Sequence, residues 1–175
     1  FAALFIGLEL LSIPLYAMIA YPVKNRHSLE GGLKYLVLSA AASAFLLIGI
    51  ALIYSQAGAL GFREVGAFFS NGGNAIARLG GALIIIGIGF KLSLVPFHLW
   101  TPDVYEGAPA PVSSYLATAS KTAVFAVLLR YFVEGGGYRQ EALLEVLGWL
   151  AFASMLVGNL LALRQNNIKR MLAYS

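Results

Sequence analysis

The chain has 175 residues, of which 59% are hydrophobic and only 11% are charged. Soluble domains carry roughly 25% charged residues, so this composition excludes a protein that meets water on all sides and indicates one that lies in a lipid bilayer. The net charge of +4 is spread over several loops, which argues against nucleic-acid binding, and the absence of cysteine excludes disulfides, thiolate-bound metals and iron–sulfur ligation.

Five apolar stretches are long enough to cross a membrane, which requires about 20 mostly apolar residues. In chain order they are 1–21, 28–54, 79–95, 111–133 and 142–163, and a further helix starts at 168–175. Ser28 is the expected N-cap of the second helix, and the polar residues 55–78 are expected to form a connector. The sequence therefore predicts an all-α, polytopic transmembrane helix bundle over residues 1–175, interpreted as one domain fragment of a longer membrane protein.

The third stretch contains a predicted helix break. Pro96 has no N–H for the carbonyl of Leu92, and Val95 before it is disfavoured in helical geometry. We expect the helix to break near Pro96 and to continue to about residue 104. Irregular backbone at membrane depth is tolerated only inside protein or beside a water-filled cavity, so the break predicts such a cavity next to Lys91.

Four ionisable side chains lie inside the predicted spans: Glu9, Lys34, Lys91 and Lys121. A charge at the bilayer centre costs a few kcal/mol and is retained where it faces a bundle interior or an aqueous path. Lys91 and Lys121 lie about 18 Å and 15 Å along their helices, close to mid-membrane. Gly87, one turn before Lys91, is expected to leave room for the ammonium and for water. Glu9 lies at a matching depth and is the expected partner of Lys91.

Each of these side chains also has an interpretation without proton chemistry. Lys91 could reach the end of a helix shortened at the break, and Lys121 could be interfacial. Glu9 could be protonated and hydrogen-bonded across helices. Lys34 could be a lysine whose stem lies along the helix end and whose ammonium reaches water.

Two polar residues follow the break. His98 and Asp103 are candidates for a proton access path beside it, and they could equally cap the half-helix. Lysine itself suits a proton carrier, because desolvation favours its neutral amine and a nearby carboxylate favours its ammonium. Moving that carboxylate would switch the lysine between its two forms, and this needs no cofactor.

These residues stand in a specific string. Residues 89–109, GFKLSLVPFHLWTPDVYEGAP, followed by ATASK at 117–121, resemble the signature of the antiporter-like membrane subunits of respiratory complex I (NADH-quinone oxidoreductase), in the form of the subunit N family. GLEL at 7–10 with PLY at 14–16 resembles the glutamate helix of that family, and NIKRMLAYS at 167–175 resembles the start of a later helix.

The resemblance implies an inverted-repeat antiporter-like fold with a broken helix in each repeat. This chain would hold one of these broken helices. It implies that Glu9 and Lys91 are the ion pair of the family, that Lys121 is the central lysine of the proton path, and that Lys34 is an accessory lysine. The rest of the path would lie beyond Ser175.

The implied function is proton translocation by a membrane subunit of NADH-quinone oxidoreductase, driven by quinone reduction elsewhere in the complex. NADH, FMN, iron–sulfur clusters and quinone are expected in other subunits, with no redox chemistry, cofactor or metal in this chain. The expected partners are the other membrane subunits, including the sister antiporter-like subunits, and the lipid of the bacterial cytoplasmic (inner) membrane.

Two alternatives stay open. A multisubunit cation/proton antiporter or a membrane-bound hydrogenase shares the broken-helix lysine motif, although the Val-Tyr-Glu-Gly form argues against it. A bundle that only scaffolds partners is the other, and the four charges within the membrane argue against that.

Overall fold

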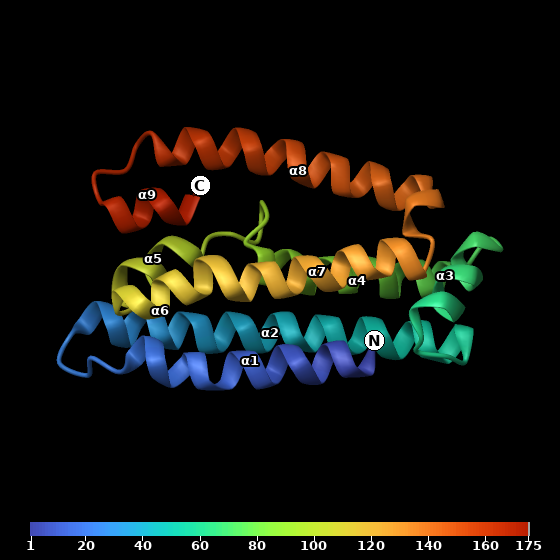
Figure 1. Cartoon of the computed structure of the whole chain (residues 1–175), viewed down its shortest axis with the longest axis horizontal. Helices are drawn as coiled ribbons and strands as arrows, with labels where there is room; N and C mark the ends of the chain where they lie inside the picture. The colour runs from blue at the N-terminus through green and yellow to red at the C-terminus, as the bar shows by residue number, and fades with distance from the viewer. Residues whose placement is uncertain (175) are drawn as a thin grey trace.

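The computed structural model describes residues 1–174. Within them every regular element is helical, and the long helices lie side by side along one axis (Figure 1). Five helical segments are long and apolar enough to cross a membrane: Ala2–Ala20, Arg26–Ala57, Ala75–Leu92, Ala110–Glu134 and Glu141–Ala162. The predicted all-α transmembrane bundle is confirmed.

The described residues form α-helices and two short turns of other helical types. In chain order they are α1 (Ala2–Ala20), α2 (Arg26–Ala57), α3 (Phe62–Ser70), α4 (Ala75–Leu92), α5 (Thr101–Gly107), α6 (Ala110–Tyr115), the π-helical turn η1 (Leu116–Ser120), α7 (Lys121–Glu134), the 3-10 turn η2 (Gly137–Arg139), α8 (Glu141–Ala162) and α9 (Ile168–Tyr174). Ser175, the last residue of the helix predicted at 168–175, lies outside the described residues.

The connections gather at the two ends of the bundle. Figure 1 shows the 21–25 and 163–167 connections at one end, with α5 and α9, and α3 with the 135–140 connection at the other. Successive long segments therefore run in opposite directions, and α4 and α5 together make one crossing that is interrupted by residues 93–100.

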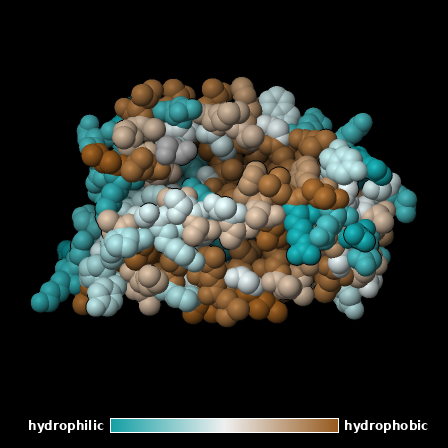
Figure 2. Space-filling view, viewed as in Figure 1, coloured by the Kyte–Doolittle hydropathy of each residue, from teal (hydrophilic) through white to brown (hydrophobic). Residues whose placement is uncertain are grey.

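The outside of the bundle is apolar. Large hydrophobic side chains such as Leu10, Trp149 and Leu160 are about two-thirds exposed, and α8 is the least covered of the long helices. Figure 2 shows hydrophobic residues across the middle of the face and hydrophilic residues gathered toward its two ends. A contiguous apolar surface of this kind is expected to lie against lipid or other membrane helices. The chain is a membrane protein.

Helices α2 and α4 are in close backbone contact. A Cβ added at Gly49 would lie 2.6 Å from the carbonyl oxygen of Gly80, and one at Gly80 would lie 2.8 Å from that of Gly49. Small residues at a helix interface let two backbones approach, which is the usual basis of packing between membrane helices. This contact fixes the helix that carries Lys91 against α2.

Residues 55–78, expected as a connector, contain the short helix α3. Val65 of α3 is fully buried, and a Cβ at Gly66 would collide with the backbone carbonyl of Gly135, so α3 lies directly against the end of α7. The connector is therefore a packed cap on one end of the bundle.

Two helices begin earlier than expected, because asparagines cap them. The side chain of Asn74 accepts a hydrogen bond from the N–H of Ala77 at 2.9 Å, so α4 starts at Ala75. Asn25 caps α2, and the expected cap Ser28 instead donates its hydroxyl to the carbonyl of Gly107 at 2.6 Å. Ser28 thus ties α2 to the end of α5.

Candidate functional site

The break between α4 and α5 begins before the proline that predicted it. Ser93 adopts the left-handed conformation (φ 60°), and the N–H of Leu94 donates to the carbonyl of Gly89 at 2.8 Å. This is a Schellman-type end, so the helix stops at Leu92, three residues before the cis Val95–Pro96 peptide. The expected break is present, but Ser93, not Pro96, ends the helix.

Lys91 lies at the end of α4, buried, with its ammonium between two other helices. Nζ donates to the hydroxyl of Ser12 on α1 at 2.6 Å and to that of Ser39 on α2 at 2.7 Å. Gly87 does not make room for water as expected. A Cβ there would lie 2.9–3.0 Å from Leu46 and the carbonyl of Ala42, so Gly87 serves the close contact of α4 with α2.

Glu9 reaches the same serine-lined region from α1. The hydroxyl of Ser43 donates to the carboxylate of Glu9. Ser43 lies one helical turn after Ser39, so neighbouring hydroxyls on one face of α2 contact the Glu9 carboxylate and the Lys91 ammonium. Within residues 1–174 no direct ion pair joins Glu9 to Lys91. We call Ser12, Ser39 and Ser43 the serine bridge.

Aromatic side chains enclose the Lys91 end of this region. The ring of Tyr35 lies 5.9 Å from the Lys91 ammonium and 5.0 Å from the ring of Trp100, which stacks on Phe90 at 5.0 Å. The indole N–H of Trp100 donates to the carbonyl of Phe90 at 3.2 Å, as a second donor beside the N–H of Ser93 at the end of α4. The aromatic wall therefore both covers the lysine and closes the helix end.

Lys121 is the first residue of α7, directly after the π-helical turn η1. Its ammonium lies 5.8 Å from the centre of the Tyr105 ring on α5. Such turns widen a helix by one residue and often occur at functional sites. The turn brings Lys121 to the broken crossing, which sequence reasoning did not foresee.

Lys34 and Asp103 are joined in an ion pair at one end of the bundle. The Nζ of Lys34 lies 2.6 Å from Asp103 and 2.6 Å from Glu30. The other oxygen of the Asp103 carboxylate lies 2.8 Å from the guanidinium of Arg170. Lys34 is thus a paired lysine, and Asp103 is ionised beside it.

Arg170 of α9 extends this cluster. Its guanidinium lies 2.8 Å from Asp103 and 2.7 Å from Glu106. Lys169 donates to the carbonyl of Ala108 at 2.8 Å. We call Lys34, Asp103, Glu106 and Arg170 the charged clamp, because it ties α5 to both α2 and α9.

His98 lies within the break, buried, with the Tyr174 ring 6.0 Å away. Within the described residues, neither of its ring nitrogens has a hydrogen-bond partner, and the same holds for the hydroxyls of Ser93, Thr101 and Tyr105. Buried polar groups are normally hydrogen-bonded to protein or to ordered water. The break therefore carries buried polar groups that suit water.

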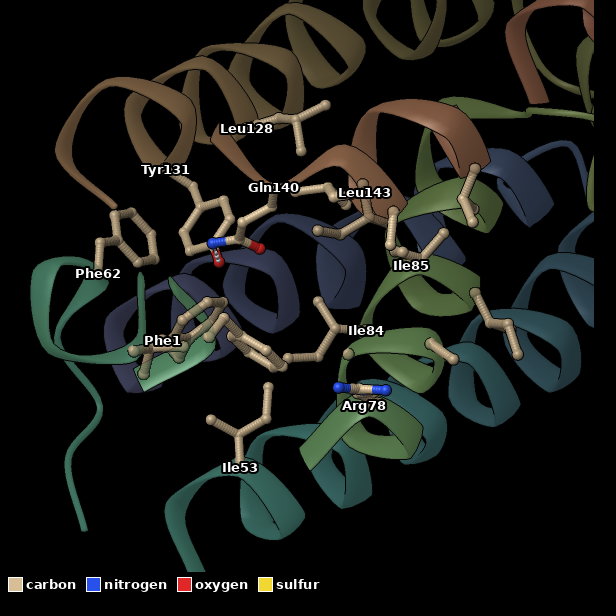
Figure 3. Close-up of a pocket in the computed structure, with 18 of the residues that line it drawn as sticks. Phe1, Ile53, Phe62, Arg78, Ile84, Ile85, Leu128, Tyr131, Gln140 and Leu143 are labelled. Carbon is tan, nitrogen blue, oxygen red and sulfur yellow. Dashed lines mark hydrogen bonds between the residues drawn. The ribbon is translucent and has the colours of Figure 1, made fainter. Parts of the chain in front are cut away.

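A cavity of about 840 Å³ lies elsewhere, between α3, α4, α7 and α8. Figure 3 shows Phe1, Phe62 and Tyr131 at one end of it, with Gln140 donating to the Tyr131 hydroxyl at 3.3 Å. Its lining is mostly apolar, and Glu9, Lys91 and Lys121 do not line it. A proton path needs polar groups, so this cavity is not the candidate site.

The serines and aromatics around Lys91 were not singled out in the sequence. The only signal for them is the spacing of Ser39 and Ser43, one turn apart in an apolar helix. Arg170 was expected only as a charge near a helix end. Within residues 1–174, no group of three or more His, Asp or Glu side chains is arranged to hold a metal ion.

Comparison with known proteins gives consistent relatives. Residues 1–175 match the family described as NADH:quinone oxidoreductase/Mrp antiporter, transmembrane. The chain is 62% identical over 172 residues to NADH-quinone oxidoreductase subunit N of Ectopseudomonas mendocina, covering 98% of this chain and 35% of that protein. The chain thus spans 35% of the length of this curated relative.

Two solved structures are similar in fold. A chain of respiratory complex I from Thermus thermophilus with bound aureothin is 42% identical with a TM-score of 0.80, over 97% of this chain and 36% of that one. A chain of the archaeal membrane-bound sulfane sulfur reductase is 33% identical with a TM-score of 0.83, over 98% of this chain and 35% of that one. The chain belongs to the NADH:quinone oxidoreductase/Mrp antiporter family of transmembrane proteins.

Proposed function

We propose that this chain is part of an antiporter-like subunit of NADH-quinone oxidoreductase, of the subunit N type, and that it moves protons through Glu9, Lys91 and Lys121. One observation carries the proposal. A buried lysine ammonium is held by hydroxyls from two other helices, and a carboxylate lies on the same serine bridge. Buried lysines without an adjacent anion are rare unless they serve transport.

The chemistry follows from the donors and acceptors. An ammonium has three N–H donors, and the serine bridge accepts two of them, which leaves one for water. Serine hydroxyls accept and donate, so they can pass a proton between a lysine and a carboxylate. A charged Glu9 favours the charged form of Lys91, and neutralising Glu9 favours release of the proton.

The charged clamp and His98 supply the proposed access path. Asp103 and Lys34 lie at the end of the bundle, while His98 lies within the 93–100 break, five residues before Asp103. Lys34 is an accessory group in this scheme, because Glu30 and Asp103 already pair with it.

We further propose that NADH, FMN, the iron–sulfur clusters and quinone are handled by other subunits, so that this chain uses energy released elsewhere. Its partners would be the other membrane subunits, including sister antiporter-like subunits, in a bacterial cytoplasmic membrane. The 62% identity to a subunit N favours this assignment.

A second candidate is a subunit of a related ion-translocating complex, a cation/proton antiporter or a membrane-bound hydrogenase. The similarity to a chain of a sulfane sulfur reductase complex favours it, at 33% identity. The subunits that copurify with the native protein distinguish the two.

The test compares Glu9→Ala, Lys91→Ala and the double variant in the assembled complex. Proton uptake by inverted membrane vesicles is measured per NADH oxidised. Because the two groups act on one step, we expect each variant to lose most pumping and the double variant to lose no more. Lys24→Ala, an exposed lysine in the 21–25 connection, is the control and should pump normally. Additive losses, or normal pumping by Lys91→Ala, would contradict the proposal.

A further inference from the structure

Tyr105 is a buried tyrosine, and both its ring and its hydroxyl have unusual surroundings. Its ring faces the ammonium of Lys121 at 5.8 Å, which is within the range of a cation–π interaction. Its hydroxyl is buried and has no hydrogen-bond partner within the described residues. Neither feature is needed for packing alone.

The ring is the group available to Lys121. Within residues 1–174 the Lys121 ammonium makes no ion pair and no hydrogen bond. It makes a cation–π contact with the ring of Tyr105. An aromatic face attracts a cation most strongly where water is excluded. The ring thus attracts the ammonium toward the broken crossing.

The buried hydroxyl of Tyr105 suits a bound water molecule. Thr101 lies one turn before Tyr105 on α5, and its hydroxyl is also buried without a partner. An unpartnered buried hydroxyl destabilises the fold, and phenylalanine at position 105 would avoid that cost. Buried water binds to polar groups of this kind, which have no partner among the described residues.

Tyr105 is also held firmly in place. The hydroxyl of Ser113 on α6 donates to the Tyr105 carbonyl at 2.9 Å, so its backbone is fixed to the crossing that carries Lys121. Two residues before Tyr105, Asp103 is held by the charged clamp. A tyrosine whose backbone is held in this way can fix the position of a flexible lysine.

We propose that Tyr105 is a positioning residue for Lys121: its ring holds the ammonium toward the break, and its hydroxyl binds a water molecule that serves the proton path. The inference rests on the proposed function, because it assigns Tyr105 a part in the same transfer. Tyr105 does not itself gain or lose the transported proton.

The test uses the assembled complex with Tyr105→Phe, which keeps the ring, and Tyr105→Leu, which removes it. Proton pumping per NADH oxidised should fall about 5- to 30-fold in Tyr105→Leu, from the loss of the cation–π contact. Tyr105→Phe should recover most of that loss and remain below the unmodified protein, because it lacks the water-binding hydroxyl. Tyr115→Leu, an exposed tyrosine on α6, is the matched control and should be unaffected.

The role of the ring would be overturned if Tyr105→Leu pumped as well as the unmodified protein. It would also be overturned if Tyr105→Leu and Tyr105→Phe pumped equally. Full pumping by Tyr105→Phe would overturn the role of the hydroxyl. If Tyr105→Leu fails to assemble, Tyr105→Met fills similar space without a ring and takes its place. Lys121→Ala is measured in parallel. Normal pumping by Lys121→Ala would contradict the proposed function. Impaired pumping by Lys121→Ala together with normal pumping by Tyr105→Leu would contradict only this inference.

Discussion

At the scale of single residues, hydroxyl groups separate the two central charges. Two unit charges 4 Å apart interact by about 4 kcal/mol at an effective dielectric near 20, which would hold a direct pair in one state. The serine bridge keeps Glu9 and Lys91 close without a direct ion pair. A weaker coupling of this kind suits two groups that must change their charge during turnover.

We therefore predict that Ser43→Ala impairs proton transfer. The substitution removes the hydroxyl that donates to Glu9 and leaves the carboxylate poorly solvated. Loss of a hydrogen bond to a charged group costs about 1.5–3 kcal/mol, so pumping should fall about 10-fold or more. Pumping per NADH oxidised in inverted vesicles is the measurement.

The control lies on the same helix. Ser55 is exposed and donates to the carbonyl of Leu52 in its own helix, so Ser55→Ala should leave pumping unchanged. Equal pumping by Ser43→Ala and Ser55→Ala would show that the serine bridge has no part in the transfer.

At the scale of elements, the short helix α5 is joined by polar contacts to three other helices. It contacts α2 through Asp103 and Lys34, α9 through Glu106 and Arg170, and α6 through the Tyr105 carbonyl. Only seven residues long, α5 cannot be stable by itself and depends on these contacts.

We predict that Asp103→Asn loosens α9. Of the two ion pairs that are lost, the one with Arg170 holds α9, and a partly exposed pair is worth about 1 kcal/mol or less, so amides of α9 should exchange with deuterium up to about fivefold faster at pH 7.

Glu134→Gln is the matched control, because Glu134 pairs with Arg130 on the surface of α7, far from α9 in the fold. It should leave exchange in α9 unchanged. Unchanged exchange in Asp103→Asn at pH 7 would mean that the charged clamp does not hold α9.

The sequence predicted the helical spans well, because apolar length is a local property. It predicted a break near Pro96 but not its cause, since the left-handed Ser93 depends on how the turn closes onto Gly89. The predicted start of α4 at residue 79 is later than the observed start at Ala75. Asn74 is one of several polar residues in this stretch, and nothing in the sequence marks it as the cap.

The candidate site was predicted only in part, because its contacts are long-range. Lys91 is 52 residues from Ser39 and Asp103 is 67 residues from Arg170, so no local pattern shows that they meet. Depth along a helix suggested that Glu9 and Lys91 lie at one level, but depth does not give the rotation of each helix. The rotation puts serines between them.

At the scale of the whole molecule, the arrangement of connections predicts a topology. The 21–25 and 163–167 connections should face one side of the membrane, and residues 58–74 and 135–140 the other (Figure 1). These 175 residues contain no cysteine, so single cysteines can be introduced without background labelling of this chain. A membrane-impermeant thiol reagent should label Asn25→Cys and Asn166→Cys from one side, and Asn71→Cys and Tyr138→Cys only from the opposite side. Labelling of Asn25→Cys and Asn71→Cys from the same side would contradict the fold.

The central claim is that buried lysines of this chain carry protons, and Lys121 tests it most directly. Lys121 is partly buried after the π-helical turn, and it takes no part in the serine bridge or the charged clamp, so its removal should leave assembly intact. The measurement is proton uptake per NADH oxidised in vesicles that contain equal amounts of assembled complex with Lys121 or Lys121→Ala. We expect Lys121→Ala to lose most pumping and most coupled quinone reduction. Normal pumping by an assembled Lys121→Ala complex would contradict the claim.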